Sequence, residues 1–191
     1  MASQRGRLLD AMAEAVAAKG YAATTVADVI ARAGVSRKTF YEHFRDKEAC
    51  FLAAYDTGVE LLLGTLRAAG TPGADPLEVA RATTVAYLET LAAEPAFART
   101  FMIEVGAAGA AARERRDAVH EQFAQLLRER AAAAGLAEQP AEIYLAAVGA
   151  TDLLVSRLVA AGRASELPAL ADVVLRVQLS LLVGASPGTL A

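Results

Sequence analysis

Three observations predict an all-α fold. The 191-residue chain is rich in alanine, which has the highest intrinsic helix propensity of the amino acids. Runs of β-branched residues, which favour strands, are nearly absent. Glycine and proline recur between apolar-periodic segments, at positions where helices commonly end. Because hydrophobic residues make up 55% of the chain, they suffice for a sizeable core, and we expect about nine helices and no sheet.

The first predicted helix is centred on residues 8–16 and ends at Gly20. Its apolar residues recur at helical spacing on one face: Leu8, Met12, Ala15 and Val16. Basic residues precede this apolar run, as they do in a signal peptide, but Asp10 and Glu14 interrupt it. We therefore predict an amphipathic helix here, and we expect no segment of the chain to span a membrane.

Residues 25–44 predict two short helices joined by a tight corner. Thr25 can cap the first helix, and Asp28 completes a short form of the capping box. Gly34 stands where helices commonly end in the left-handed conformation, and Ser36 can cap a second helix almost at once. The first helix carries one apolar stripe: Val26, Val29, Ile30 and Ala33. This is the anatomy of a helix-turn-helix, whose second helix lies in the major groove of DNA.

The second of these helices divides into an inward-facing and an outward-facing set. Phe40 and Phe44 lie four residues apart and, with Val35, can face the first helix. The remaining side chains are candidate DNA contacts: Arg37, Lys38, Thr39, Tyr41 and His43. Because the N-terminal residues of such a helix meet the base edges, we expect the first three to read bases and the last two to hold phosphates.

A second interpretation stays open for each of these side chains. The two basic residues can be an ordinary solvated helix start, the tyrosine can form the edge of a core, and the histidine can cap its own helix. Lys47 follows Asp46, a predicted N-cap of the next helix. The Lys47 ammonium and the free backbone N–H groups there can share one phosphate.

The charge distribution supports a local rather than a general attraction to nucleic acid. The formal net charge is −3, but residues 1–50 carry +2 and the remainder carries −5. Between Arg37 and Lys47 there are four basic residues against two acidic ones. The positive potential is therefore concentrated on the predicted reading helix.

A family resemblance lies in residues 25–51, which read TVADVIARAGVSRKTFYEHFRDKEACF. This run resembles the signature of TetR/AcrR transcriptional regulators in its Thr-Val opening, Ala-Gly-Val-Ser corner, Thr-aromatic-Tyr centre, His-Phe pair and Lys-Glu exit. The resemblance covers about the first third of the chain. It implies operator contacts at Thr25, Arg37, Lys38, Thr39, Tyr41, His43 and Lys47, and we include Ser36 among the predicted DNA-binding residues. Many members have Gly at the position of Lys38, which adds a positive charge, and Leu at that of Phe40, which keeps a core role.

Beyond Lys47 the chain reads as a series of helices separated by glycine and proline. The predicted helices cover residues 47–69, 77–93, 96–105, 111–134, 141–161 and 166–183. The sequence TPGADP, residues 71–76, is a clear loop. We expect a DNA-binding domain over residues 2–62, a helical effector-binding and dimerisation domain over 63–184, and a loose tail over 185–191.

The last two predicted helices suggest an interface between two copies of the chain. Small residues of the first would allow another helix to approach closely, and the second has too broad an apolar face for an exposed terminal helix. The predicted interface residues are Ala147, Ala150, Leu154, Leu158, Leu170, Val174, Val177 and Leu181. Burial within one subunit is the alternative to a four-helix bundle formed by two. A dimer would place two reading helices on a twofold axis, which suits a pseudo-palindromic operator.

Aromatic and sulfur-containing residues gather in the segments that would surround the centre of the second domain. They are Tyr87, Phe97, Phe101, Met102, Phe123 and Tyr144, with Glu104 and His120 as polar neighbours that can orient a ligand. These side chains can equally fill a core. The family resemblance favours a pocket for a small, mostly apolar effector.

Cys50 is the single cysteine, which excludes an intramolecular disulfide and is typical of a reducing cytoplasm. We expect it to be a buried apolar residue rather than a redox sensor, because it stands beside Phe51 and Leu52 on a helix.

The sequence thus predicts a cytoplasmic, homodimeric DNA-binding regulator, a repressor that a small molecule releases from its operator. We expect no catalytic residues, metal site or cofactor, because the chain has two histidines, one cysteine and no nucleophile elbow. An enzyme built on a helical bundle is the alternative that this absence disfavours. A helical interaction or ligand-binding protein without operator binding remains an open alternative.

Overall fold

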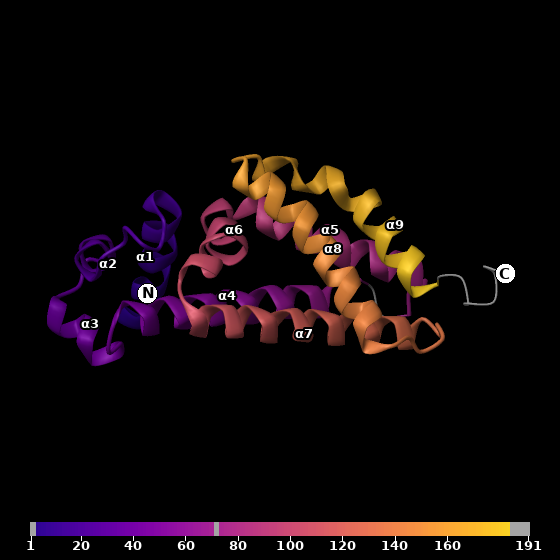
Figure 1. Cartoon of the computed structure of the whole chain (residues 1–191), viewed down its shortest axis with the longest axis horizontal. Coiled ribbons are helices and arrows are strands. Elements are labelled where there is room, and N and C mark those ends of the chain that lie inside the picture. Colours follow the sequence, from indigo (N-terminus) through magenta and orange to yellow (C-terminus); the bar gives the residue numbers. More distant parts are fainter. Residues whose placement is uncertain (1–2, 71–72, 184–191) are drawn as a thin grey trace.

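The computed structural model describes residues 3–70 and 73–183, and within them it confirms the all-α fold. The elements in chain order are α1 (Gln4–Lys19), α2 (Val26–Ala33), α3 (Arg37–His43), α4 (Lys47–Ala68), α5 (Pro76–Ala93), α6 (Pro95–Met102), the 3₁₀ helix η1 (Glu104–Ala107), α7 (Ala110–Ala133), α8 (Ala141–Ala160), the 3₁₀ helix η2 (Ala164–Leu170) and α9 (Ala171–Leu182). Helices α1 to α3 form one end of an elongated molecule, and α4 and α7 run lengthwise toward the other end, where α5, α8 and α9 gather (Figure 1).

The predicted corner between α2 and α3 has the expected local structure. The Thr25 hydroxyl accepts from the Asp28 N–H at 3.3 Å, and the Asp28 carboxylate accepts from the Thr25 N–H at 2.7 Å, which completes the capping box. Gly34 is left-handed at φ +62°, and the Ser36 hydroxyl accepts from the Thr39 N–H at 3.0 Å. Short-range capping therefore fixes both ends of the turn that carries α3.

The core of this end is built from the predicted apolar faces. Leu8, Met12, Ala15 and Val16 of α1 are buried, as are Val29, Phe40 and Phe44. Cys50 is fully buried too, and burial raises the pKa of its thiol to about 12. The thiol is therefore protonated at neutral pH, which confirms its role as a small apolar core residue.

The predicted helices over 96–105 and 166–183 are wrong in their extents. Helix α6 ends at Met102 and is followed by η1, and the second segment divides into η2 and α9. Pro168 explains the division, because proline has no backbone N–H to donate within an α-helix. The apolar spacing of this segment continues across Pro168, so periodicity alone concealed the break.

Helix α4 is continuous across residues 62 and 63, where the domain boundary was expected. It packs against α1 at its N-terminal end and against α5, α6 and α7 further along. The two domains thus share a rigid element, and the boundary stays a prediction. The first residue of the expected DNA-binding domain, part of the TPGADP loop and the expected tail over 185–191 lie outside the described residues.

Two helices, α4 and α8, are long and apolar enough by length and composition to cross a membrane, contrary to the expectation of none. Both pack against other helices of the chain: α4 lies within the bundle, and α8 contacts α6, α7 and α9. Their hydropathy therefore reflects helix packing, and the outward side of α8 is considered below.

Candidate nucleic-acid interface and internal pocket

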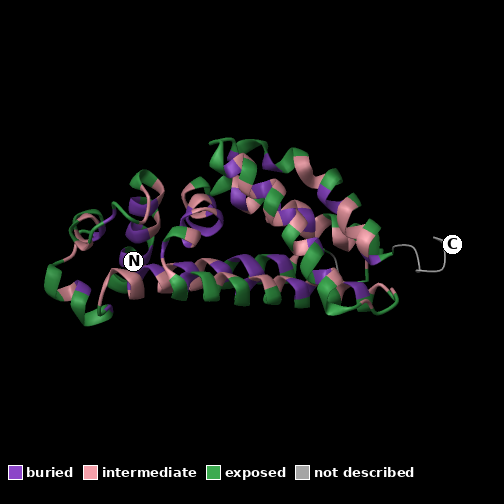
Figure 2. Cartoon of the chain, in the orientation of Figure 1, coloured by how far each residue is buried: buried purple, intermediate pink, exposed green. Residues whose placement is uncertain are grey.

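Helix α3 presents most of the predicted DNA-binding side chains to solvent. Arg37, Lys38, Tyr41 and His43 are exposed, whereas Thr39 is half-buried. Phe40, on the opposite side of the same helix, is fully buried against the core. In Figure 2 the ribbon of α3 is largely green, at the end of the molecule opposite the C-terminal ends of α4 and α7. The single buried anchor thus orients the whole polar face outward.

The charged groups of α3 make only weak contacts with one another. The Arg37 guanidinium lies 5.6 Å from the centre of the Tyr41 ring, and the Lys38 ammonium lies 3.8 Å from the Glu42 carboxylate. Both contacts are solvent-exposed, where such pairs contribute on the order of 1 kcal/mol or less. Phosphates or base edges can therefore replace these partners at low cost.

Lys47 differs from the other predicted DNA contacts, because its ammonium is already engaged. It donates to the carbonyl oxygens of Tyr21 and Thr24, both at 2.9 Å, and lies 4.1 Å from the centre of the Tyr21 ring. An ammonium has three donors, so one is left for a phosphate. The structure thus gives Lys47 a clamping role between α4 and the α1–α2 connection, and its phosphate contact stays a prediction.

Glu104 was predicted to orient a ligand, and the structure corrects this assignment. Its carboxylate, which is 8% exposed as a residue, accepts from the backbone N–H of Tyr21 at 2.9 Å and lies 3.3 Å from the Arg99 guanidinium. Gly20 has φ +82°, and a Cβ there would come within 3.3 Å of the Glu104 carboxylate. Glu104 therefore ties η1 to the DNA-binding end instead of lining the pocket.

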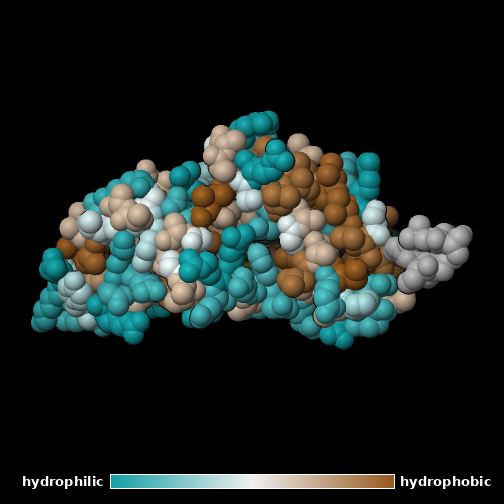
Figure 3. Space-filling view, viewed as in Figure 1, coloured by the Kyte–Doolittle hydropathy of each residue, from teal (hydrophilic) through white to brown (hydrophobic). Residues whose placement is uncertain are grey.

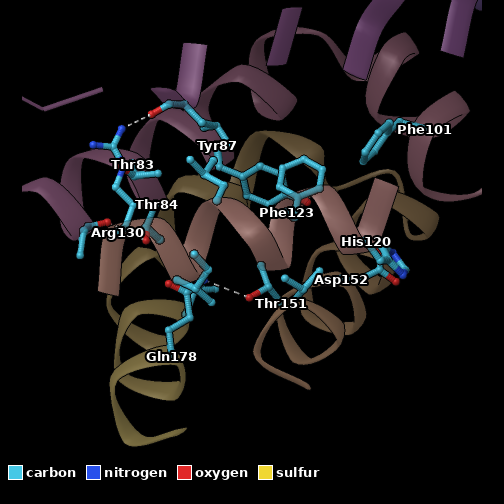
Figure 4. Close-up of a pocket in the computed structure, with 16 residues that line it drawn as sticks. Thr83, Thr84, Tyr87, Phe101, His120, Phe123, Arg130, Thr151, Asp152 and Gln178 are labelled. Carbon is cyan, nitrogen blue, oxygen red and sulfur yellow. Dashed lines mark hydrogen bonds and ion pairs between the residues drawn. The ribbon is translucent and has the colours of Figure 1, made fainter. Parts of the chain in front are cut away.

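An internal pocket of about 100 Å³ lies between α4, α5, α6, α7, α8 and α9. Four predicted residues line it, namely Tyr87, Phe101, His120 and Phe123, and Figure 4 shows their rings along one side of the space. The remaining apolar lining comprises Leu66, Ala80, Leu126, Leu127, Val148 and Val174. The pocket is thus mainly apolar, as expected for a site that takes small ligands.

Three other predicted pocket residues lie elsewhere. Phe97 packs on α4 so closely that a Cβ on Gly58 would overlap its ring. Met102 is buried behind the pocket wall, with its sulfur 3.9 Å from the Tyr87 hydroxyl. Tyr144 belongs to a second small core with Ala124 and Leu182. The sequence shows that these side chains are large and mostly apolar. Tertiary packing sets the rotation of each helix about its axis, and that rotation decides which side chains face the pocket.

Sequence reasoning missed the polar part of the lining, which is Thr83, Thr84, Arg130, Thr151, Asp152 and Gln178. Asp152 accepts from Arg116 at 2.7 Å and lies 3.6 Å from the His120 imidazole. Burial alone would raise the pKa of Asp152, but its interactions with His120 and Arg116 outweigh burial and lower that pKa. The adjacent pair Thr83 and Thr84, within the ATTVAYL stretch of α5, was the available signal.

A wider groove of about 740 Å³ adjoins the pocket beside the C-terminal ends of α4 and α7. Four residues line both spaces: Ala80, Leu127, Arg130 and Gln178. The inner pocket thus connects toward solvent past these side chains.

The outward faces of α8 and α9 correct part of the predicted interface. Ala147 and Val174 are buried within the chain, so they are not available to a partner. Leu145, Leu153 and Val173 are instead 37%, 59% and 45% exposed. In Figure 3 hydrophobic side chains gather in a brown band over these two helices. Periodicity selected the inner stripe of α8 because this helix is apolar on both sides. The other six predicted interface residues are half-buried and stay predictions.

Comparison with known proteins gives a family for the N-terminal end. Residues 8–54 match the family model described as bacterial regulatory proteins, tetR family. The HTH-type transcriptional activator FasR of Mycolicibacterium smegmatis is 33% identical over 86 residues, which are 45% of this chain and 39% of that protein. The match thus spans about two fifths of this curated relative. Both descriptions concern transcriptional regulators rather than enzymes.

Solved structures share the fold over nearly the whole chain. The fatty acid degradation regulator FadR from Bacillus halodurans superimposes with a TM-score of 0.80 at 20% identity, covering 95% of this chain and 96% of that one. FadR from Bacillus subtilis, solved in complex with stearoyl-CoA, gives a TM-score of 0.73 at 19% identity, covering 94% and 98%. The architecture of the C-terminal helices is therefore shared as well as that of the N-terminal end.

Proposed function

We propose that this chain is a TetR-family, cytoplasmic transcriptional regulator that binds a pseudo-palindromic operator as a homodimer and is released by a small, mostly apolar molecule. The observation that carries this proposal is α3, a helix capped by Ser36 and anchored by Phe40, whose cationic face is exposed within the matched segment. The proposed DNA contacts are Thr25, Ser36, Arg37, Lys38, Thr39, Tyr41, His43 and Lys47.

A homodimer is supported by the apolar surface over α8 and α9. Leu145, Leu153 and Val173 are large apolar side chains that remain exposed, and two helices can pair with two from a second copy. A dimer also compensates for the small DNA contact surface of α3, which has only seven residues. Two such helices on a twofold axis can enter successive major grooves.

An effector site is supported by the inner pocket. FadR of Bacillus subtilis was solved with stearoyl-CoA bound, and the shared fold and the apolar lining support an apolar effector for the pocket here. Phe101 of α6 lines the pocket and stacks on Tyr55 of α4, with ring centres 5.3 Å apart. We propose that a ligand moves α4 and α6 and so changes the spacing of the two reading helices, which requires different ligand affinities for the two spacings.

The decisive experiment is selection of bound fragments from genomic DNA by the purified full-length protein, followed by fluorescence anisotropy on a labelled selected duplex. We expect nanomolar or tighter binding that weakens about a thousandfold or more between 50 and 200 mM salt. Fragments enriched no better than bulk DNA would refute operator recognition and favour a helical interaction or ligand-binding protein. A reporter gene behind the selected site tests repression, since loss of expression is expected when the protein is present.

The dimer is tested separately with Leu153→Glu. A charge in the apolar surface of α8 should convert dimers to monomers in analytical ultracentrifugation. Leu61→Glu is the matched control, because Leu61 is 69% exposed on α4 and lies outside the α8–α9 surface. A wild-type monomer at micromolar concentration would contradict the proposed assembly.

A further inference from the structure

Most hydrogen-bond donors around the inner pocket are already used within the protein. The hydroxyls of Thr83, Thr84 and Thr151 donate to carbonyl oxygens of their own helices at 2.8, 3.0 and 2.9 Å. Gln178 donates to the Thr151 hydroxyl at 3.4 Å. A threonine hydroxyl has one proton, so the three threonines have nothing left to donate to a ligand, whereas the Gln178 amide keeps its second N–H.

Arg130 differs from these side chains because it has an unused donor that is buried in the lining. Its Nη2 donates to the carbonyl oxygens of Leu66 and Arg67, at 3.1 and 2.8 Å. Its Nε is buried and has no hydrogen-bond partner among the described residues. Buried donors are nearly always satisfied, so an orphaned guanidinium N–H beside a cavity requires an explanation.

The charge of Arg130 is also without a partner in the described part of the chain, where no carboxylate lies within 4 Å of it. The one carboxylate of the lining, Asp152, is engaged by Arg116 and His120. A group that accepts a hydrogen bond, and preferably carries negative charge, would satisfy both the Nε and the charge of Arg130.

The position of Arg130 separates two environments. On one side lies the mainly apolar pocket of about 100 Å³, and on the other the wider groove of about 740 Å³, and both are partly open to solvent. A dry cavity of roughly 150 Å³ binds benzene, so the inner pocket in this state accommodates a short apolar segment. A larger or polar remainder of the same molecule fits only the groove.

We propose that the effector is an amphiphile whose carbonyl or carboxylate group is bound by the Nε of Arg130, with an apolar tail in the inner pocket and any larger polar part in the outer groove. The regulatory role of this amphiphile rests on the proposed function. Its binding to the pocket does not depend on DNA. In Figure 4 Arg130 lies beside Thr83 and Thr84 at one end of the pocket, and the aromatic rings lie beyond them.

Capping of α4 is the competing role for Arg130, because its Nη2 satisfies two carbonyl oxygens at that helix end. This role uses neither the Nε nor the pocket. A ligand test with matched tails and different head groups separates the two roles.

The test uses octanoate, octan-1-ol and octylammonium at equal sub-millimolar concentrations with the purified full-length protein, by isothermal titration calorimetry. The three probes share one tail and differ in the head group. Octanoate should bind at least tenfold more tightly than octan-1-ol, and octylammonium, which can only donate, should not bind detectably. Equal affinity for octanoate and octan-1-ol, or binding of octylammonium, would overturn the proposal.

Variants locate the bound head group. Arg130→Lys keeps the charge but removes the Nε, and it should reduce octanoate affinity at least tenfold and abolish the preference over octan-1-ol. Arg128→Lys is the control, since Arg128 is half-exposed on the same helix and pairs with Glu138 at 2.7 Å. Phe123→Trp should fill the inner pocket and abolish binding of octanoate and octan-1-ol. Undiminished octanoate binding by either Arg130→Lys or Phe123→Trp would refute the assigned site.

Failure of this proposal is distinguishable from failure of the proposed function. Arg130→Lys should bind the selected duplex as the wild type does, because Arg130 is far along the chain from α3 and contacts the end of α4 away from the DNA-binding helices. If the wild-type protein bound octanoate but no selected DNA, the proposed regulator function would be refuted and the proposed ligand site would stand.

Discussion

The exposed face of α3 and the lining of the inner pocket differ in how their hydrogen-bond donors are satisfied. Arg37 and Lys38 keep their donors in water, where solvent satisfies them until DNA takes its place. The hydroxyls of the pocket threonines donate to carbonyl oxygens of their own helices, because a buried donor without a hydrogen-bond partner costs free energy. A solvated surface can therefore carry many spare donors, whereas a buried lining can carry few.

The largest expected effect is on the free energy of unfolding, when the aromatic side chain under the face of α3 or beside the inner pocket is truncated. Phe40→Ala should lower the free energy of unfolding by about 3–5 kcal/mol, because Phe40 is fully buried and the truncation leaves a cavity. Phe123→Ala should cost clearly less, since Phe123 is half-buried and already borders a cavity. Urea denaturation followed by circular dichroism measures both values. Equal losses would break the contrast between a tightly packed reading unit and a loosely filled pocket.

The next largest effect is on operator affinity, when side chains of the exposed face of α3 are truncated. Combined Lys38→Ala and Tyr41→Ala substitutions should weaken operator binding by about 1–3 kcal/mol per lost contact and leave dimerisation unchanged. Arg67→Ala is the control, since Arg67 is exposed at the opposite end of α4. Anisotropy at several salt concentrations measures the affinity and its salt dependence. Unaltered affinity of the double variant would reject the role of these two side chains.

Glu104 lies between the two regions, and its removal tests how they are joined. Glu104→Ala leaves the Tyr21 N–H and the Arg99 guanidinium without their partner, which should cost about 1–3 kcal/mol of stability. Glu104→Gln keeps an acceptor oxygen and should lose less. Thermal unfolding, together with hydrogen exchange at the Tyr21 amide, reports the difference. A Glu104→Ala protein as stable as Glu104→Gln would show that this bond contributes nothing.

The smallest effect is at the start of the reading helix. Ser36→Ala removes the hydroxyl that accepts from the Thr39 N–H and should cost about 1 kcal/mol. Ser36→Asp retains a capping oxygen and should restore stability, but its negative charge near the DNA should still weaken binding. Stability and DNA affinity that change in parallel in both variants would contradict a separate capping role.

The contrast between the regions also explains what the sequence could predict. The α2–α3 unit depends on contacts within a few residues, such as Thr25 with Asp28 and Ser36 with Thr39, and these were predicted correctly. Glu104 with Tyr21 joins residues 83 positions apart, so no local pattern indicates it. Ala147 was wrongly predicted to lie at the α8 interface for a related reason, because that helix is apolar on two sides and only tertiary packing buries Ala147 while exposing Leu153.

The pocket was predicted in part for the same physical reason. Tyr87, Phe101 and Phe123 line the pocket as their aromatic character suggested, because large apolar side chains tend to surround the centre of a helical bundle, and their contact with a ligand stays a prediction. Arg130 was missed because a basic residue near a helix C-terminus usually faces solvent. Its inward position depends on the carbonyl oxygens at the end of α4, which only the folded chain brings near.

The burial of Cys50 makes this protein well suited to spectroscopy. A thiol that is inaccessible and protonated does not react with maleimide or methanethiosulfonate reagents under native conditions, so the natural chain needs no cysteine removed. A single cysteine introduced at an exposed position, such as Glu42→Cys, would carry the sole spin label in each protomer. Pulsed electron resonance could then measure directly the distance between the two α3 helices of an assembly, with and without added octanoate.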